Sequence, residues 1–337
     1  MKYPFISQIL ADIAPEMNIM VELEPEFGFV GELVFHNGTR HLFRNANFNI
    51  NPAGSTEIAK DKGYTNYILN KHGFNVPEGK TFFSNSMIRN LPNDKRRGIA
   101  SAIDYVQTIG YPVFIKPNNL HQGILVTKIY QNSDLECVAE RIFEKTDVLL
   151  VERAYSGRDY RIVVLNDKII SAYERIPLFV VGDGKHMIQD LLISAKNNLE
   201  KIGRPNAEID LEDYRIDMNL VRQNLSRKSV VPEGEKIFLL NNANLSSGGT
   251  SQDVTHSIHE SFIEKALKAT KTLGLRLSGV DVICEDITSD IEKQEWCILE
   301  VNAAPGLDNY ASLGDEQLER VKMLYMEILR YLEKMLL

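Results

Sequence analysis

The sequence predicts an α+β protein with a short N-terminal module followed by two larger mixed units. An Asn-Gly turn between apolar runs near the start predicts a strand pair, and short apolar runs then alternate with helical patterns through the middle of the chain. A second series of strands and helices follows and ends in an amphipathic helix. We place the boundaries of the three parts at residues 1–56, 57–154 and 155–337.

The N-terminal module is expected to contain a β-hairpin. Apolar runs at residues 29–35 and 40–43 flank the sequence His-Asn-Gly-Thr at 36–39. The two central positions of such a turn need positive φ, which Asn and Gly tolerate. Residues 45–51 then carry Asn at every second position. On a strand these amides would line one face and offer hydrogen bonds to a polar ligand, with a solvated edge strand as the alternative.

The second part begins with a predicted helix that starts near Ser55 or Thr56 and runs through Lys62 to about Lys71, before Gly73. Apolar runs that are typical of strands follow at 81–83, 113–116, 124–127 and 148–151. Helical patterns lie between them at 98–109 and 133–145. This alternation predicts a compact mixed unit.

The third part opens with two strands, at 160–165 and 169–175, joined by an Asn-Asp turn. A polar region at 186–222 is expected to be helical, and the loop 244–250 precedes a helix at about 257–273. The closing helix, at about 315–336, carries one apolar stripe that should face a core, formed by Leu318, Val321, Tyr325, Ile328 and Leu332.

Length and composition limit the class of protein. With 337 residues and 44% hydrophobic content, the chain can bury a substantial core. A net charge of -8, with no basic cluster longer than residues 95–97, argues against nucleic-acid binding. Cys137, Cys284 and Cys297 stand in apolar surroundings, which predicts buried, reduced thiols. No run is apolar enough to span a bilayer and the first residues lack a signal-peptide core, so we expect a cytoplasmic protein without a membrane partner.

A candidate metal site lies near the end of the third part. Glu300 and Asn302 project from the same face of a predicted strand, about 7 Å apart. Asp281, on a neighbouring apolar strand, can converge on them. Three oxygen donors of this kind suit Mg²⁺, which is completed by water and substrate phosphates. Glu-x-Asn alone is common at polar strand edges, but the preceding Asp and the following Pro305-Gly306 turn favour the metal.

Familiar nucleotide motifs are missing from the sequence. No Walker A motif occurs, and no GxGxxG follows a predicted strand. The run Val-Gly-Asp-Gly-Lys-His at 181–186 resembles a phosphate loop only superficially. A hairpin turn beside the site and a functional role for Lys185 or His186 both remain open.

Several separated motifs together resemble one family. They are Asp61-Lys62, Pro112-Val113-Phe114-Ile115-Lys116-Pro117, Gly157-Arg158-Asp159-Tyr160-Arg161, Glu174-Arg175-Ile176-Pro177, the runs at 180–186 and 244–249, Gly279-Val280-Asp281-Val282 and Glu300-Val301-Asn302-Ala303-Ala304-Pro305-Gly306. In order and spacing, residues 57–310 resemble the ATP-grasp superfamily of carboxylate–amine ligases, most closely the ATP-grasp region of cyanophycin synthetases and glutathione-synthetase-like ligases. The resemblance implies two α+β subdomains that clamp a nucleotide, with 57–154 as the lid, 155–337 as the core that carries the metal site, and 1–56 as a candidate for substrate recognition.

The resemblance also implies which residues bind ATP. Lys62 and Lys116 would contact its phosphates, since a lysine is a compact cation. The segment Glu152, Arg153, Ala154 and Tyr155 would form the hinge whose backbone holds the adenine, and Asp159 would accept hydrogen bonds from the ribose.

A loop at 118–123, with His121, Gln122 and Gly123, would cover the phosphates. It has a single glycine where relatives carry more, which predicts a stiffer loop.

Catalytic roles fall, by the same resemblance, to Arg161 and Arg175, whose guanidinium groups would stabilise charge near the γ-phosphate or the acyl-phosphate. Surface ion pairs are the alternative reading for strand arginines. Asn244 and Ser246, in a loop with Ser247 and two glycines, would lie against the phosphate or the acyl group.

The function implied is an ATP-dependent ligase that phosphorylates the carboxylate of an amino acid or short peptide and lets an amine displace the phosphate. ATP and Mg²⁺ are the expected cofactors, with two metal ions and Mn²⁺ as an alternative. Small-molecule substrates are the expected partners, and a homodimer is left open. Cyanophycin synthetases carry further domains on both sides of this region, so we expect a single-reaction ligase. The alternatives are a non-catalytic ATP-binding regulatory or scaffold protein, suggested by the glycine-poor loop, and an ATP-grasp phosphotransferase.

Overall fold

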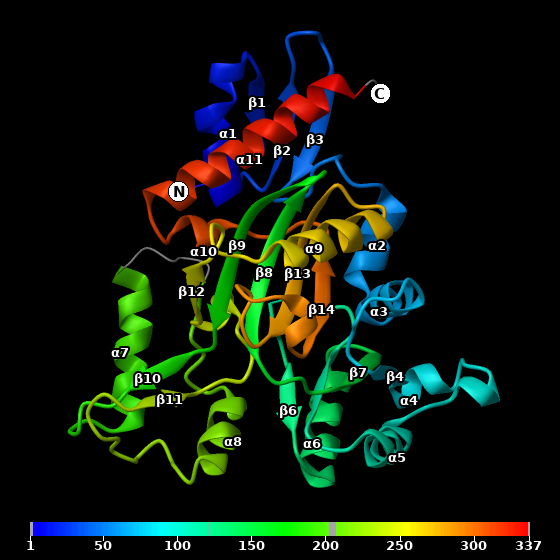
Figure 1. The fold of residues 1–337 in the computed structure, drawn as a ribbon, viewed down its shortest axis with the longest axis vertical. Helices are drawn as coiled ribbons and strands as arrows, with labels where there is room; N and C mark the ends of the chain where they lie inside the picture. The colour runs from blue at the N-terminus through cyan, green and yellow to red at the C-terminus, as the bar shows by residue number, and fades with distance from the viewer. Residues whose placement is uncertain (1–2, 121, 202–206, 336–337) are drawn as a thin grey trace.

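The computed structural model describes residues 3–120, 122–201 and 207–335 (Figure 1). Its strands form a central five-stranded sheet, a four-stranded sheet, a three-stranded sheet and a strand pair. Adjacent strands run antiparallel in every pairing of the described residues. The predicted α+β class is confirmed.

The N-terminal module folds as α1 (Phe5–Ile13), η1 (Pro15–Met17), β1 (Met20–Leu23), β2 (Val30–Val34) and β3 (Arg40–Arg44). The predicted hairpin is confirmed as β2 and β3, whereas α1 and β1 were missed. The closing helix α11 (Asp315–Lys334) packs against α1, with Val321, Tyr325, Ile328 and Leu332 buried as the apolar stripe predicts. The two ends of the chain therefore share one core (Figure 1).

The Asn-rich segment 45–51 is not the predicted strand. It forms turns with one bridge, between Arg44 and Asn47. Ala46, Phe48 and Ile50 are buried, while the alternate asparagines 45, 47 and 49 are exposed. The alternation arises because the apolar residues between the asparagines are anchored in the core, so these three amides face solvent.

Asn51 differs from the other asparagines, because it joins the module to the central sheet. Its Nδ2 donates to the carbonyls of Leu277 and Ala303, both at 2.8 Å. Its Oδ1 accepts from the backbone N–H groups of Arg276 (2.8 Å) and Leu277 (3.0 Å). One side chain thus satisfies four backbone groups.

The predicted helix at 55–71 is two helices, α2 (Ala53–Lys60) and α3 (Lys62–Lys71). They are separated by Asp61, whose side chain caps α3 by accepting from Tyr64 N at 2.9 Å. A cap of this kind starts a new helix and was not read from the sequence.

The four-stranded sheet, called the lid here, has the order β4-β7-β5-β6. Its elements in chain order are β4 (Gly79–Phe83), α4 (Asn85–Ile88), η2 (Asn93–Lys95), α5 (Ile99–Ile109), β5 (Val113–Pro117), β6 (Thr127–Ile129), α6 (Asn132–Phe143) and β7 (Val148–Arg153). Helices α5 and α6 cover one face and form a core with it. β6 begins three residues later than predicted, because Gln122 and Leu125 adopt positive φ in the preceding loop.

The remaining elements, in chain order, are β8 (Arg158–Leu165), β9 (Lys168–Ile176), β10 (Phe179–Val181), α7 (Ile188–Lys201), α8 (Tyr214–Arg222), β11 (Lys236–Phe238), η3 (Leu245–Ser247), β12 (Thr250–Asp253), α9 (Glu260–Thr272), β13 (Leu277–Cys284), η4 (Ile291–Lys293), β14 (Trp296–Asn302), α10 (Asp308–Ala311) and α11. The predicted helical region 186–222 is two separate helices, α7 and α8. The segment 181–186 is not a hairpin turn, because β10 pairs with the distant β11. β10, β11, α7 and α8 share a small core of their own.

The central sheet, in the order β12-β9-β8-β13-β14, has two different faces. One face carries Tyr160, Ile162 and Val164 and packs against α9 and residues of α2 and α3. The other face carries Val163 and Tyr173 and packs against the N-terminal module and α11. Along the strands this second face changes from apolar to charged, and the charged half carries the candidate site.

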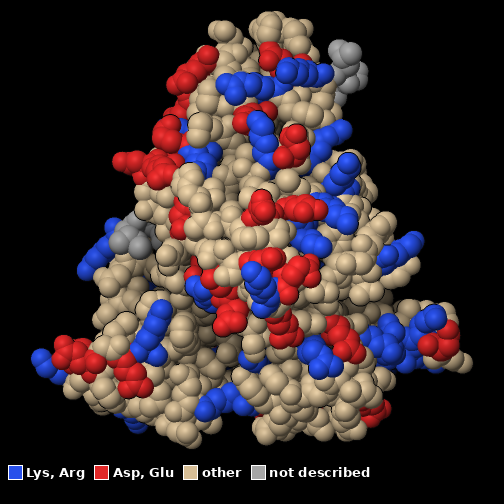
Figure 2. All heavy atoms as spheres, viewed as in Figure 1, with Lys and Arg blue, Asp and Glu red and all other residues tan. Residues whose placement is uncertain are grey.

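Two of the three cysteines have the predicted burial. Cys284 and Cys297 are buried as expected, but Cys137 is exposed, because it lies on the outer side of α6 while Leu135 and Val138 fill the core. None of the described helices is both long and apolar enough to cross a bilayer. Figure 2 shows acidic and basic side chains interspersed over one face of the molecule.

Replacing Asn51 with Ala should lower the free energy of unfolding by about 2–4 kcal/mol, because three half-buried backbone hydrogen bonds and one exposed one lose their partner. Urea denaturation measures the change. The matched control is Asn49→Ala, in the same segment but exposed, which should change stability by less than about 0.5 kcal/mol. Equal effects of the two substitutions would contradict the role given to Asn51.

Candidate functional site

The charged half of the central sheet is built by strand register. Residues directly opposite each other in antiparallel strands point to the same face. Asp281 on β13 lies opposite Arg161 on β8 and Glu300 on β14. One row away, Asp159 on β8 lies opposite Arg175 on β9, and Asn302 ends β14 opposite Gly279. Six predicted site residues therefore share one face: Asp159, Arg161, Arg175, Asp281, Glu300 and Asn302.

Two carboxylates and two guanidinium groups alternate in this face. Arg161 binds Asp281 with two hydrogen bonds, Nε to Oδ1 at 2.6 Å and Nη2 to Oδ2 at 2.7 Å. Arg175 bridges both acids, since its Nη2 lies 2.6 Å from Asp159 Oδ1 and 2.9 Å from Asp281 Oδ2. All four side chains are largely buried. The arrangement excludes the alternative reading of these arginines as surface ion pairs.

The two acids have opposite pKa shifts. Burial, reinforced by the charge of Asp281, raises the pKa of Asp159 to about 6 despite the neighbouring Arg175. Burial would also raise the pKa of Asp281, but Arg161 and Arg175 outweigh it and hold that pKa below its ordinary value. Asp281 is therefore ionised at neutral pH, the state that a metal ligand needs.

The three predicted metal ligands are neighbours on this face of the sheet. With its amide nitrogen turned toward Glu300, Asn302 donates to Glu300 Oε1 at 3.1 Å and accepts from Arg161 Nη2 at 3.1 Å. Arg161 thus contacts both Asn302 and Asp281. Within the described ranges no three His, Cys, Asp or Glu side chains form a metal cluster, because the third oxygen donor here is an amide. Two carboxylates and an amide oxygen fit Mg²⁺ or Mn²⁺ completed by water and phosphate.

A register shift in β14 changes the direction in which the side chains of Glu300 and Asn302 point. Asp281 pairs with Glu300, but the next residue, Val282, pairs with Ile298, so Leu299 is an extra residue in the strand. A bulge of this kind redirects side chains and is common beside functional sites. Sequence reading treated β14 as a regular strand and missed the bulge.

Two buried lysines lie next to the acids. Lys62, at the start of α3, donates to the carbonyl of Leu120 at 2.9 Å and lies 3.7 Å from Glu300 Oε1. Lys116, on β5 of the lid, lies 2.5 Å from Glu152 Oε2. Burial would lower the pKa of Lys116, but the Glu152 carboxylate, with a contribution from Glu300, raises it. Lys116 is therefore held as a cation, and both lysines lie at the boundary between the lid and the central sheet.

The predicted hinge leads from β7 into β8. Glu152 is buried and also accepts from Asn66 Nδ2 at 2.8 Å. The backbone N–H groups of Arg153 and Ala154 donate to Glu78 O and Pro112 O. Tyr155 is half-buried, and burial raises the pKa of its hydroxyl. These contacts fix the backbone of the hinge, and its adenine-binding role stays a prediction.

The predicted phosphate loop and the predicted acyl loop touch each other. Ser246 Oγ donates to Gln122 O at 3.4 Å. Gly123 has φ +69°, and a Cβ there would lie 2.3 Å from Asn244 Oδ1 and 2.6 Å from Asn242 Nδ2. Only glycine fits this close approach. His121 lies outside the described residues.

Arg215 of α8 is a site residue that sequence reading missed. Its Nη1 donates to the carbonyls of Gly123 at 2.8 Å and Val126 at 3.2 Å. Asp213, which caps α8, holds the same guanidinium through Nη2 at 2.6 Å. The signal available in the sequence was an Asp one residue before a helix, and nothing local revealed a partner some 90 residues earlier.

Comparisons with known proteins show which families the chain resembles. Residues 68–182 match the family model described as D-ala D-ala ligase C-terminus. The cyanophycin synthetase of Crocosphaera subtropica is 36% identical over 264 residues, which cover 75% of this chain and 28% of that protein. The glutathione biosynthesis bifunctional protein GshAB of Desulfotalea psychrophila is 29% identical over 255 residues, 74% of this chain and 31% of that protein. The chain thus spans less than a third of the length of these relatives.

The solved structure of a bifunctional glutathione synthetase from Pasteurella multocida has the same fold. It superimposes with a TM-score of 0.59 over 97% of this chain and 44% of that chain, at 24% sequence identity. The fold class read from the sequence is confirmed by this likeness.

Arg215→Met should loosen the phosphate loop, because two charge-assisted hydrogen bonds to its carbonyls are lost. Hydrogen exchange of peptides spanning 118–126 should become roughly tenfold faster, since their local opening becomes easier. Arg227→Met is the matched control, because Arg227 pairs with Asp217 and Leu211 O and is not bonded to the loop. Unchanged exchange in Arg215→Met would show that the loop does not depend on this contact.

Proposed function

We propose that this chain, which belongs to the ATP-grasp superfamily and is similar to part of the cyanophycin synthetases, is an ATP-dependent ligase that forms amide or peptide bonds. ATP-grasp ligases use ATP and a divalent metal ion, usually Mg²⁺. The carboxylate substrate would be an amino acid or a short peptide, activated as an acyl-phosphate. An amine would then attack the activated carbonyl and expel phosphate.

One observation carries the proposal: Asp281, cross-strand from Glu300, lies among buried cations. Arg161 and Arg175 contact Asp281, and Lys62 lies 3.7 Å from Glu300. A network with a purely structural role would need only to neutralise its own charges. Here acids and cations alternate at the boundary of two sheets, which suits a ligand that contains both a metal ion and phosphate groups.

Asp281, Glu300 and Asn302 would hold the metal, with two ions as our proposal and Mn²⁺ as a substitute. The bound metal would neutralise charge on the transferring phosphoryl group. Lys62 and Lys116 would bind the triphosphate as compact cations.

Arg161 and Arg175, already oriented by Asp281, would stabilise the charge that develops on the acyl-phosphate. Asn244 and Ser246 would close over the acyl group, and the hinge 152–155 with Asp159 would bind the nucleoside.

No covalent enzyme intermediate is needed in this scheme. Burial raises the pKa of the Cys284 thiol to about 12 and raises that of Cys297 as well, so both stay protonated and weakly nucleophilic. The work of the site is to position two substrates and stabilise charge.

The test is a substrate screen. Purified protein is incubated with ATP, Mg²⁺ and pools of amino acids and short peptides, and phosphate release and products are measured by mass spectrometry. Phosphate release that requires both a carboxylate and an amine, with a condensed product, supports the ligase. A stable phosphorylated product would identify a phosphotransferase instead, and no turnover with any pool would identify an ATP-binding regulatory protein.

Glu300→Ala should lower turnover roughly 100-fold or more while the midpoint of thermal unfolding stays close to that of the wild type, because Glu300 is partly exposed and packs in no core. Binding of Mg²⁺-ADP, followed by calorimetry, should weaken, whereas metal-free ADP should bind as before. Glu292→Ala, an exposed acid on η4, is the control and should leave both unchanged. Full turnover in Glu300→Ala would remove Glu300 from the metal site.

A further inference from the structure

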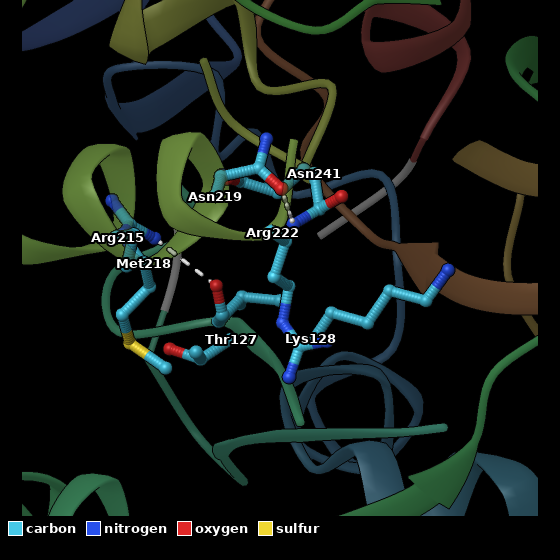
Figure 3. A pocket seen from close by; sticks show the side chains of 9 residues that line it. Thr127, Lys128, Arg215, Met218, Asn219, Arg222 and Asn241 are labelled. Carbon is cyan, nitrogen blue, oxygen red and sulfur yellow. Dashed lines mark hydrogen bonds between the residues drawn. The ribbon is translucent and has the colours of Figure 1, made fainter. Parts of the chain in front are cut away.

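The pocket between β6 and α8 is too small for a substrate (Figure 3). Its volume is about 10 Å³, close to that of the smallest cavity that holds one water molecule. Arg215, which lines this pocket, is bound to Asp213 and to the phosphate loop. The residues around the pocket therefore hold the loop in place, and no substrate fits between them.

A polar network at the outer edge of the central sheet has no role in the proposed reaction. Its four members come from three elements and are Asp253 of β12, Tyr310 of α10, and Gln317 and Arg320 of α11. Asp253 Oδ2 accepts from Tyr310 Oη at 2.8 Å and from Gln317 Nε2 at 2.9 Å. Arg320 Nη1 donates to the same Asp253 oxygen at 3.2 Å and to Tyr310 Oη at 2.9 Å. We call these four residues the Asp253 network.

The Asp253 network is charged and largely buried. The side chains of Asp253 and Arg320 are 19% and 11% exposed, and Tyr310 is fully buried. Burial would raise the pKa of Asp253, but hydrogen bonds, chiefly from Thr255 and Gln317, outweigh it and hold that pKa below its ordinary value. Asp253 is therefore an anion at neutral pH, and its hydrogen bonds are charge-assisted. Removing one partner would leave the others buried without a full set of hydrogen bonds, which is costly.

Strand β12, which carries Asp253, continues directly from the predicted acyl loop, residues 244–249. It is an edge strand of four residues, and its one sheet partner among the described residues is β9. Ser251 lies opposite Arg175 and Asp253 lies opposite Tyr173, so both side chains point to the face that carries the candidate site. A short edge strand has few contacts, so the position of β12 depends strongly on the hydrogen bonds of Asp253.

The partners of Asp253 lie on the segment that follows the metal donors. Asn302 ends β14, and the chain then leads through a loop to Tyr310 in α10. The ring of Tyr310 stacks on Tyr173, the residue opposite Asp253, with ring centroids 4.9 Å apart. Figure 1 shows β12 beside α10 at this edge of the sheet. Asp253 therefore joins the strand that leaves the acyl loop to the segment that leaves the metal donors.

We propose that Asp253 is a positioning residue, which fixes the acyl loop relative to the segment that follows the metal donors. The inference rests on the proposed ligase function. The acyl loop would contact the carboxylate substrate and the metal would contact the transferring phosphoryl group, so the distance between them sets the geometry of acyl-phosphate formation. Nucleotide binding would not need this geometry, because Lys62 lies beside Glu300 of β14, at the opposite edge of the sheet from β12.

Steady-state kinetics separates a positioning role from a purely structural one, using the carboxylate and amine that give product in the screen. Asp253→Asn should raise the KM for the carboxylate roughly tenfold or more, while the KM for ATP changes less than about twofold. Arg320→Met should have the same effect. Arg320→Lys, which keeps the charge, should raise the carboxylate KM less than about threefold. A purely structural role predicts a lower unfolding temperature with both KM values unchanged.

Asp286→Asn is the matched control. Asp286 also accepts three hydrogen bonds, from Thr288 N, Thr288 Oγ1 and Ser289 Oγ, and these hold its pKa below its ordinary value. It lies in the connection between β13 and β14, outside the Asp253 network. Asp286→Asn should leave both KM values as in the wild type.

Hydrogen exchange tests the proposal without turnover. Peptides spanning 244–253 should exchange roughly tenfold faster in Asp253→Asn, while peptides of α6 and the affinity for Mg²⁺-ADP should not change. Unchanged exchange in 244–253, an equal rise of the two KM values, or an unchanged carboxylate KM would each overturn the proposal. Failure of the ligase function is a separate outcome, in which the wild type forms no product. The exchange of 244–253 would then decide alone whether Asp253 fixes the loop.

Discussion

The pairing of Asp281 between Arg161 and Arg175 is the constraint on which the site depends. It follows from the antiparallel order β9-β8-β13-β14, which sets the four charged side chains side by side. A buried carboxylate without these partners would take up a proton and lose its use as a metal ligand. The apolar half of the same face, packed under the N-terminal module, keeps the strands in register. One sheet therefore provides both the apolar core under the N-terminal module and the charged side chains of the candidate site.

The conformation of the glycine-poor loop of the lid depends on contacts with residues that are far from it in the sequence. Relatives are expected to reach phosphate with several flexible glycines, whereas here Gln122 and Leu125 hold left-handed conformations, with a single glycine between them. Arg215 and Ser246 satisfy carbonyls of this loop from two other elements. The conformation of this loop is thus held by residues outside it, and Arg215 couples the loop to α8.

Local patterns were sufficient for several elements that bury one face, although α1, which also buries one face, was missed. The hairpin at β2 and β3 and the stripe of α11 follow from turn chemistry and periodicity, and the order of motifs along the chain gave the fold. The Asn-rich segment 45–51 was misread as a strand. Alternating polar and apolar residues occur in strands, but they also occur in an irregular segment whose every second residue is buried. The break at Asp61 is a local cap that sequence reading overlooked, whereas the contact of Arg215 with the phosphate loop joins distant segments, which one sequence does not display.

The sharing of one core by the first and last elements has a consequence for biosynthesis. α1 and the three-stranded sheet emerge from the ribosome early, yet Leu10 and Phe48 stay uncovered until α11 is made. During translation the central sheet can assemble around α9 while its other face waits for the final helix. The core that these elements share can therefore form only after α11 has been made, and a chain truncated before α11 would expose the apolar side chains of α1.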